Sequence, residues 1–416
     1  YEFSLFSEFA SKVEAIEYSM KHLKAWMKPE KRSANKPMNF LGGKSQVRYY
    51  PKGVVGIISP WNLPFGLTVA PLTSALAAGN RALLKPSEFV PETAALFAEV
   101  VPRYFAEEEV AVVTGGAAIS QQFAELPFDH LLFTGSTRIG AKVMQSAAKN
   151  LVPVTLELGG KSPVVIGRSA KVELAGTRLT FGKLLNGGQL CLSPDYVLVP
   201  EELEAQLIAR VVSETQSMYP NITENTDYAG VFDERHFARL QGYIDDAVAK
   251  GAKLTIVGAD KTRASEGNRR MPLHILQNVT EDMQVMHEEI FGPLLPVMTY
   301  ADITEVPNKI EPRRNPLALY YFGKDKSEQE YLLSHVPSGG VCINDITLHY
   351  VQEDLPFGGV GASGMGAYHG PEGFRNMSHA RAIYSQTMID ILPIIGARPP
   401  FGDKFRKNIG KILGAI

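Results

Sequence analysis

The spacing of hydrophobic residues predicts a chain of alternating helices and strands. Near the N-terminus, apolar side chains recur at three-, four- and seven-residue steps, which predicts one amphipathic helix ending at Pro29. From residue 54, short apolar runs that predict strands alternate with longer segments that predict helices. The strands are 54–59, 82–85, 110–114, 130–134 and 154–158, and the helices are 65–78, 91–105 and 138–149. This alternation is typical of a parallel sheet with helices on both faces.

A second α/β series follows Gly159-Gly160, and we place a domain boundary there. Its predicted helices are 172–185, 201–217 and 232–249, and its predicted strands are 196–200, 253–257, 294–300 and 317–322. Ahead of the first series, a strand at 47–50 is expected to pair across Gly42-Gly43. A hairpin of this size is not stable alone, so we expect it to pack elsewhere or against another chain.

Composition narrows the class of protein. A chain of 416 residues with 45% hydrophobic and 21% charged residues is long enough for two or three domains. A net charge of −2 gives no reason to expect a nucleic-acid partner. Two cysteines exclude a disulfide framework and suit a reducing compartment, so we expect a cytoplasmic protein. No apolar run reaches about 18 residues, so we expect no helix that spans a membrane. We also expect no metal site. The chain starts at Tyr1 without Met, and we expect further sequence before it.

Cys191 lies where a predicted helix gives way to a strand, between Gly187-Gly188 and the turn Pro194-Asp195. Such a junction can present a side chain to a cleft. A free cysteine is more often a small buried hydrophobe, so the residue alone leaves both interpretations open.

Two turns at strand ends have the chemistry of nucleotide binding. Gly135 and Ser136 begin a Gly-x-x-x-x-Gly turn between a strand and a helix, where backbone N–H groups can approach a phosphate. Lys85 and Glu88 follow another strand, where they could hydrogen-bond ribose hydroxyls. The alternatives are an ordinary tight turn and a solvated turn.

Three further polar residues stand in stiff or apolar surroundings. Glu157 lies in an apolar strand, which suits a general base, unless it simply pairs with Lys161. Glu289 is a second isolated acid before an apolar strand. Asn62 lies between two prolines, where a rigid amide suits an oxyanion site or merely forms a turn.

Together these stretches resemble the aldehyde dehydrogenase superfamily over about residues 50–380. Seven motifs occur in the family's order: Ser-Pro-Trp-Asn-Leu-Pro (59–64), Lys-Pro-Ser-Glu (85–88), Phe-Thr-Gly-Ser-Thr (133–137), Glu-Leu-Gly-Gly-Lys (157–161), Gly-Gln-Leu-Cys (188–191), Glu-Glu-Ile-Phe-Gly-Pro (288–293) and Pro-Phe-Gly-Gly-Val-Gly (356–361). The stretch Ser193–Tyr196, with 364–370 and 378–381, resembles the class 3 branch, which includes the bacterial coniferyl aldehyde dehydrogenases.

The resemblance implies a role for each motif. Cys191 would be the nucleophile, Asn62 and the Cys191 backbone N–H the oxyanion site, and Glu157 the general base. The implied cofactor contacts are Trp61, Lys85, Glu88, Gly135, Ser136, Glu289 and Phe291. Leu190 stands where the family usually has Thr, which we expect to alter the shape of the pocket without removing the chemistry.

The resemblance also implies an α/β fold with a Rossmann-type NAD-binding domain (1–32 and 51–158), a catalytic domain (159–362), a small β oligomerisation element (33–50 and 370–395) that builds a homodimer, and a tail helix (396–416). The implied activity is hydrolytic oxidation of an aldehyde, aromatic such as coniferyl aldehyde or medium-chain aliphatic, with NAD preferred and NADP accepted. The many aromatic residues, including Tyr320 and Tyr321, favour a bulky aromatic substrate, although core packing explains most of them equally well. The alternatives are a CoA-acylating enzyme and a non-catalytic binding relative.

The tail carries a second open question. Phe405, Ile409, Ile412, Leu413 and Ile416 share one helical face opposite three lysines. This pattern fits a helix docked on the protein or a partner subunit better than a membrane-surface helix.

Overall fold

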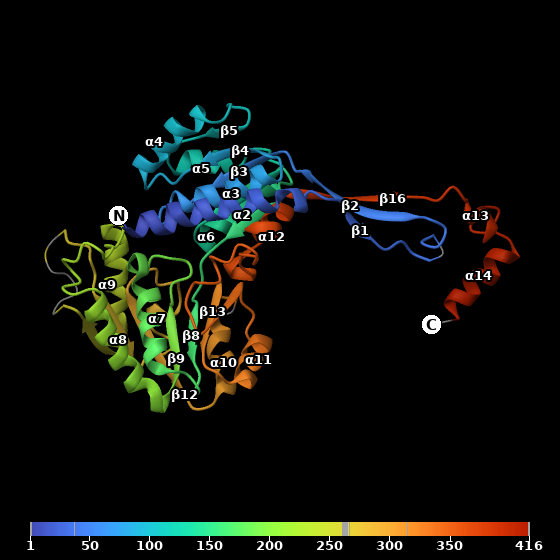
Figure 1. The fold of residues 1–416 in the computed structure, drawn as a ribbon. Helices are drawn as coiled ribbons and strands as arrows, with labels where there is room; N and C mark the ends of the chain where they lie inside the picture. The colour runs from blue at the N-terminus through green and yellow to red at the C-terminus, as the bar shows by residue number, and fades with distance from the viewer. Residues whose placement is uncertain (1, 37, 260–264, 266, 314, 415–416) are drawn as a thin grey trace.

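The computed structural model describes residues 2–36, 38–259, 265, 267–313 and 315–414. Figure 1 shows two α/β lobes and a long arm that projects from them and carries the C-terminus at its tip. Each lobe is built on its own sheet, and a third, smaller sheet forms the arm.

The first sheet has the strand order β15-β7-β6-β3-β4-β5. Neighbouring strands from β7 to β5 are parallel, and β15 adds an antiparallel edge beside Glu157. The strands are β3 (Val54–Ile58), β4 (Arg81–Lys85), β5 (Val110–Val112), β6 (His130–Thr134), β7 (Val154–Glu157) and β15 (Gly364–Met365). The parallel sheet expected from residue 54 onward is therefore confirmed.

Helices cover both faces of this sheet because alternate strand residues point to opposite sides. Val55 and Ile57 pack with α3 (Gly66–Ala77) and α4 (Pro91–Val100), whereas Ile58 and Leu131 pack with α5 (Ala117–Ala124) and α6 (Thr137–Ala148). The sequence pattern had not predicted α5. The helix expected at 91–105 changes to a 3-10 turn at Val101–Arg103.

The second sheet has the order β10-β11-β12-β9-β8-β13-β14 and is parallel except at β10. Its strands are β8 (Pro163–Ile166), β9 (Tyr196–Pro200), β10 (Lys253–Val257), β11 (Leu273–Gln277), β12 (Leu294–Tyr300), β13 (Ala318–Phe322) and β14 (Gly340–Ile343). One face packs on α7 (Val172–Leu184) and α8 (Glu204–Met218). The other packs on α9 (Glu234–Ala249), α10 (Val306–Ile310) and α11 (Lys326–His335).

The arm corrects the predicted hairpin. β2 (Lys44–Pro51) lies between β1 (Glu30–Arg32) and β16 (Ser378–Ser385), antiparallel to both. The partner of the predicted strand therefore lies before residue 33, and the connection is longer than a turn at Gly42-Gly43. Beyond β16, α13 (Ile391–Ile394) and α14 (Asp403–Leu413) lie at the tip. The tail helix is thus shorter than 396–416. Residues 415–416, including Ile416 of its apolar face, lie outside the described residues.

The N-terminal segment is also more complex than one helix. Glu2–Ser4 (α1) leads into a π-helical turn at Leu5–Ala10, and α2 (Ser11–Trp26) follows. α2 packs on α3 and on α12 (Gly370–Asn376). Within the described part of the chain, no helix has the length and apolar character needed to cross a membrane.

Candidate active site

One large cavity gathers almost all the residues singled out in the sequence. Its volume is about 1610 Å³, and residues of both lobes line it. The lining includes Trp61, Asn62, Glu88, Gly135, Ser136, Glu157, Cys191, Glu289 and Phe291. Lys85 is the exception. Its side chain is 0% exposed, donates a hydrogen bond to the Pro86 carbonyl (2.9 Å) and lies 3.5 Å from the Glu88 carboxylate.

Cys191 follows a turn that requires glycine at position 188. α7 ends at Leu184, and Asn186, Gly187 and Gly188 then adopt positive φ angles of 52°, 63° and 75°. A Cβ on Gly188 would lie 2.5 Å from the Gly292 carbonyl oxygen, which is closer than real contacts allow. The turn therefore presses the Cys191 segment against the segment that follows Phe291.

Asn62 is fastened to the same turn. Its Nδ2 donates to the Gln189 carbonyl oxygen at 3.0 Å, and Asn186 Nδ2 donates to the Asn62 carbonyl oxygen at 3.2 Å. Gln189 extends the link, because its Nε2 donates to the Gly230 carbonyl oxygen and its Oε1 accepts from the Phe232 N–H. The amide predicted for the oxyanion site is thus held beside the turn that carries Cys191.

Glu157 is a buried acid. It is 3% exposed, and neither carboxylate oxygen has a hydrogen-bond partner among the described residues. The alternative that it pairs with Lys161 is wrong, because Lys161 forms an ion pair with Asp195. Burial raises the pKa of Glu157 well above its ordinary value. A carboxyl group in this state is suited to act as a general base.

Glu289 enters the cavity through space that Gly159 leaves open. A Cβ on Gly159 would overlap the Glu289 carboxylate. Burial and the nearby charge of Asp195 raise the pKa of Glu289 to about 8, against the lowering effect of the Gly160 N–H and Lys161. The next residues turn sharply, since Phe291 has a φ of 51°.

The thiol of Cys191 is half-buried and lies close to both acids. Desolvation raises its pKa to about 12, and the negative charges of Glu289 and Glu157 contribute in the same direction. The thiol is therefore protonated at neutral pH in the protein alone, and nucleophilic attack requires a base or a change in local charge.

The other end of the cavity fits an anionic dinucleotide. α6 begins at Thr137, directly after Ser136, and its N-terminus presents free N–H groups with a positive dipole end. A Cβ on Gly135 would lie 2.5 Å from the Phe133 ring, so this position excludes a side chain. Buried oxygens of Thr134 and Glu289 lack partners among the described residues, as expected where a ligand supplies them. The residues present fit a nicotinamide dinucleotide.

The sequence pattern did not single out several residues that line the cavity. Arg235, His236 and Arg239 come from the start of α9, and Arg239 donates to the Ile290 carbonyl oxygen at 2.7 Å. Trp61 stacks on Phe232 with centroids 4.2 Å apart and meets Phe291 edge-on. By contrast, Tyr320 and Tyr321 are buried within β13 and are absent from the cavity lining, so core packing accounts for both.

The chain is similar to known proteins over most of its length. A family model described as the aldehyde dehydrogenase family matches residues 3–383. A probable coniferyl aldehyde dehydrogenase of Caulobacter vibrioides is 46% identical over 405 residues, covering 97% of this chain and 84% of that protein. Mouse aldehyde dehydrogenase family 3 member A2 is 42% identical over 351 residues, covering 84% and 71%.

Solved structures give the same result. The substrate-bound state of Staphylococcus aureus AldH has a TM-score of 0.90 at 35% identity, covering 99% of this chain and 87% of that one. An NAD-dependent aldehyde dehydrogenase of Sinorhizobium meliloti has a TM-score of 0.83 at 27% identity, covering 95% and 76%. The resemblance inferred from the motifs, including its class 3 character, is confirmed. The chain belongs to the aldehyde dehydrogenase family and is an oxidoreductase that acts on aldehydes with a nicotinamide cofactor.

Proposed function

We propose that Cys191, Glu157 and Asn62 carry out hydrolytic aldehyde oxidation in the large cavity. The observation that carries this proposal is their convergence. Three segments far apart in the sequence bring a thiol, an unpartnered acid and an amide donor to one cavity whose other end suits a dinucleotide.

The chemistry follows from these groups. The Cys191 sulfur, once deprotonated, attacks the carbonyl carbon and forms a thiohemiacetal. Asn62 Nδ2–H and the Cys191 N–H donate to the oxyanion, and such donors are worth about 2.7–4 kcal/mol each. A nicotinamide cofactor, when bound, supplies the acceptor for the hydride that leaves this carbon. Loss of that hydride leaves a thioester between the substrate carbon and Cys191. Glu157 then takes a proton from water as the water oxygen attacks the thioester carbon, the C–S bond breaks with the Cys191 thiolate as leaving group, and the carboxylic acid is released.

The cofactor choice rests on Glu88. Its carboxylate lines the cavity and is held by Lys85 at 3.5 Å. A 2′-phosphate beside this carboxylate would be repelled, so we assign NAD as the preferred cofactor. Arg235, which also lines the cavity, lies over the Phe89 ring at 5.9 Å and offers a positive charge near Glu88, consistent with some use of NADP.

The substrate we propose is an aromatic aldehyde, coniferyl aldehyde in particular, with medium-chain aliphatic aldehydes second. The named activity of the Caulobacter relative supports this choice. Phe357 and Tyr368, which line the cavity with Cys191, could pack against an aromatic ring.

A kinetic screen tests the proposed function. Purified protein is given coniferyl, benzyl-type and medium-chain aldehydes with NAD or NADP, and formation of the reduced cofactor is followed by absorbance. We expect the highest kcat/KM for coniferyl aldehyde with NAD, and loss of nearly all activity in Cys191→Ala. Acid formed without coenzyme A supports hydrolysis, whereas a thioester product formed only with coenzyme A would establish the acylating alternative.

Single-turnover kinetics test the role of Glu157. In Glu157→Gln, a burst of reduced cofactor should persist while steady-state turnover falls about 100-fold, because general-base catalysis contributes about 10²–10⁴-fold. Loss of the burst with normal thioester hydrolysis would show that Glu157 has another role.

We also propose the division of labour among the three sheets. The first lobe would bind the dinucleotide, the second would carry Cys191, and the arm of β1, β2 and β16 would join two copies in a homodimer. A three-stranded arm that buries few of its own side chains supports this assignment, since so small a sheet gains little stability alone.

A further inference from the structure

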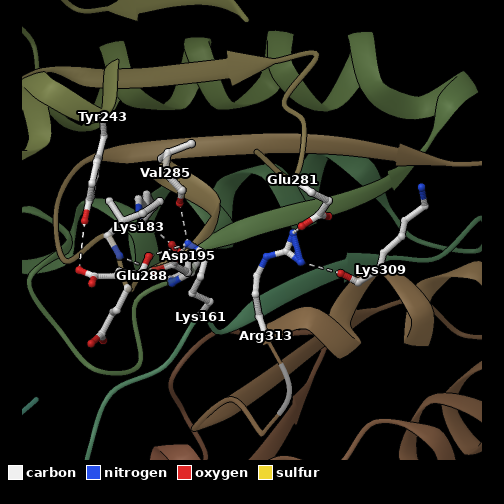
Figure 2. Close-up of polar contacts among 12 residues, drawn as sticks. Lys161, Lys183, Asp195, Tyr243, Glu281, Val285, Glu288, Lys309 and Arg313 are labelled. Carbon is white, nitrogen blue, oxygen red and sulfur yellow. Dashed lines mark hydrogen bonds and ion pairs between the residues drawn. The ribbon is translucent and has the colours of Figure 1, made fainter. Parts of the chain in front are cut away.

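A buried ion pair lies at the wall of the cavity that Cys191 and Glu289 also line. Lys161 and Asp195 form it, and their side chains are only 3% and 4% exposed. Figure 2 shows the pair surrounded by segments of the second lobe. A buried ion pair is seldom more stabilising than an apolar pair of the same volume. The function of this pair is therefore sought in the backbone groups that it contacts.

Both side chains of the pair also hydrogen-bond to the backbone. Lys161 Nζ donates to Asp195 Oδ1, to the Val285 carbonyl oxygen at 2.8 Å and to the Glu288 carbonyl oxygen at 3.0 Å. Asp195 Oδ2 accepts from the Ile290 N–H at 2.9 Å. The pair therefore grips the chain immediately before and immediately after Glu289.

The same pair is anchored to the Cys191 turn. Asp195 lies in the chain four residues after Cys191, and its own N–H donates to the Ser162 carbonyl oxygen at 2.8 Å. Lys183 in α7 donates to the Pro194 carbonyl oxygen at 2.8 Å and fixes the middle of this connection. The turn that ends at Asp195 cannot move without moving the Ile290 N–H.

We propose that Asp195, held by Lys161, is a positioning residue that uses the Ile290 N–H to keep the Glu289 carboxylate in the cavity at a fixed place relative to Cys191. This inference rests on the proposed role of Cys191 and on the cofactor contact that the family resemblance implies for Glu289. It also gives the Ser193–Tyr196 stretch a physical role. Asp195 forms the hydrogen-bonded tether to the Ile290 N–H. The centroid of the Tyr196 ring lies 5.9 Å from Lys161 Nζ and 5.2 Å from Arg313 Cζ.

The tether has a strained segment to restrain. Phe291, one residue beyond Ile290, has a left-handed backbone, and Gly292 abuts Gly188. Arg239 holds the Ile290 carbonyl oxygen from the cavity side, so Asp195 and Arg239 fix opposite edges of the same peptide segment. Without Asp195, relaxation at Phe291 would withdraw Glu289 from the cofactor.

Two double variants separate positioning from folding. Lys161→Met/Asp195→Leu removes both charges and the acceptor for the Ile290 N–H. Lys161→Met/Asp195→Asn removes both charges but keeps a carbonyl oxygen as the acceptor. Both variants lose the same two charges and the same Lys161 hydrogen bonds, so they should unfold in urea at similar midpoints. Glu202→Gln, which breaks the exposed Arg168–Glu202 pair, is the control.

The measurement is the dissociation constant for NADH, followed by its fluorescence. We expect the Asn double variant and Glu202→Gln to bind within about twofold of wild type, and the Leu double variant to bind about tenfold or more weakly, since a misplacement near 1 Å is costly at such sites. Equal affinity of the two double variants would overturn the proposal. If the Leu variant does not fold, Lys161→Met/Asp195→Ala gives the same comparison.

This experiment is independent of turnover. A wild-type protein that binds NADH but oxidises no aldehyde would count against the proposed function and leave the binding comparison intact. A protein that oxidises aldehydes normally while both double variants bind NADH alike would count against the positioning role alone.

Discussion

At the scale of single residues, the cavity sets a thiol against two carboxyl groups. Cys191 gains its high pKa from burial first and from Glu289 and Glu157 next. The residue types could be identified from motifs, but their protonation could not, because it depends on burial and on neighbours up to about 100 positions away in the chain. Two predictions follow from these neighbours.

The first concerns Glu289→Gln and the reactivity of the thiol. Below its pKa of about 8, Glu289 is neutral and has little effect on Cys191, whereas above it the carboxylate raises the thiol pKa. Alkylation of Cys191 by iodoacetamide should therefore match wild type near pH 6.5 and become roughly threefold faster in the variant near pH 9. Cys191→Ala supplies the background from Cys342. A slower variant at pH 9 would contradict this charge coupling.

The second concerns Glu157→Gln and stability. Burial without a partner raises the folded-state pKa of Glu157, so wild type loses stability as pH rises from the unfolded-state value through the folded-state value. Gln does not ionise. The variant should gain roughly 1–2 kcal/mol in the free energy of unfolding at pH 8, with the gain vanishing near pH 4. Urea denaturation at both pH values measures this difference, and an equal gain at both would rule out ionisation as the cause.

At the scale of elements, the N-terminal π turn supports the loop that carries Asn62. Glu8 in this turn accepts hydrogen bonds from the N–H groups of Phe65 (2.8 Å) and Gly66 (3.2 Å), where α3 begins. α3 has no cap of its own from Phe65. A carboxylate from another helix thus serves as the cap, and it fixes the chain just after Asn62.

Glu8→Ala should expose the importance of this cap. Loss of two hydrogen bonds to a charged acceptor should cost about 1.5–3 kcal/mol in the free energy of unfolding, and freedom of the Asn62 loop should lower kcat more than it raises KM for the aldehyde. Glu17→Ala, on the exposed side of α2, should change stability by less than about 0.5 kcal/mol. If the Glu8 variant matches the Glu17 variant in both stability and kinetics, Glu8 does not act as the cap of α3.

The elements also mark the limits of prediction from sequence. Strands with five or more apolar residues, such as β9 and β13, were predictable from local pattern. β8 was missed because Pro163 opens a strand of only four residues, and β11 because His274 interrupts its apolar run. β16 alternates polar and small residues on an exposed arm and gains its partner from β2, more than 300 positions earlier.

In the site, too, some features follow from the sequence and others depend on contacts between distant segments. Cys191, Glu157 and Asn62 were predictable from the resemblance. The backbone contacts of Arg239, Gln189 and Asp195 were not, although Gln189 and Asp195 lie in quoted stretches, because only the fold creates those contacts. Local pattern gave no sign of the pairing of Lys161 with Asp195, which left Glu157 unpartnered. Contacts between distant segments are therefore where the sequence alone was insufficient.

At the scale of the whole molecule, the arm gives a test of assembly. β16 lies at the edge of the three-stranded sheet, and α13 and α14 follow it at the tip. If the arm joins two copies, light scattering should give about twice the 45.6 kDa of one chain. Removal of residues 386–416 should leave the dimer, and removal of 378–416 should yield a monomer that still binds NADH. A dimer in the shorter chain would place the interface elsewhere.

The shared cavity has a thermodynamic consequence. Because residues of both lobes line it, a dinucleotide bound there contacts both lobes and adds to the hydrophobic core that already joins them. The free energy of dinucleotide binding is then added to the free energy that holds the two lobes together. At 100 times its dissociation constant, NAD should add about 2.7 kcal/mol to the free energy of unfolding, and both lobes should melt together. Calorimetry of Cys191→Ala, with and without NAD, measures this cohesion apart from catalysis; two separate transitions in saturating NAD would mean that the ligand holds only one lobe.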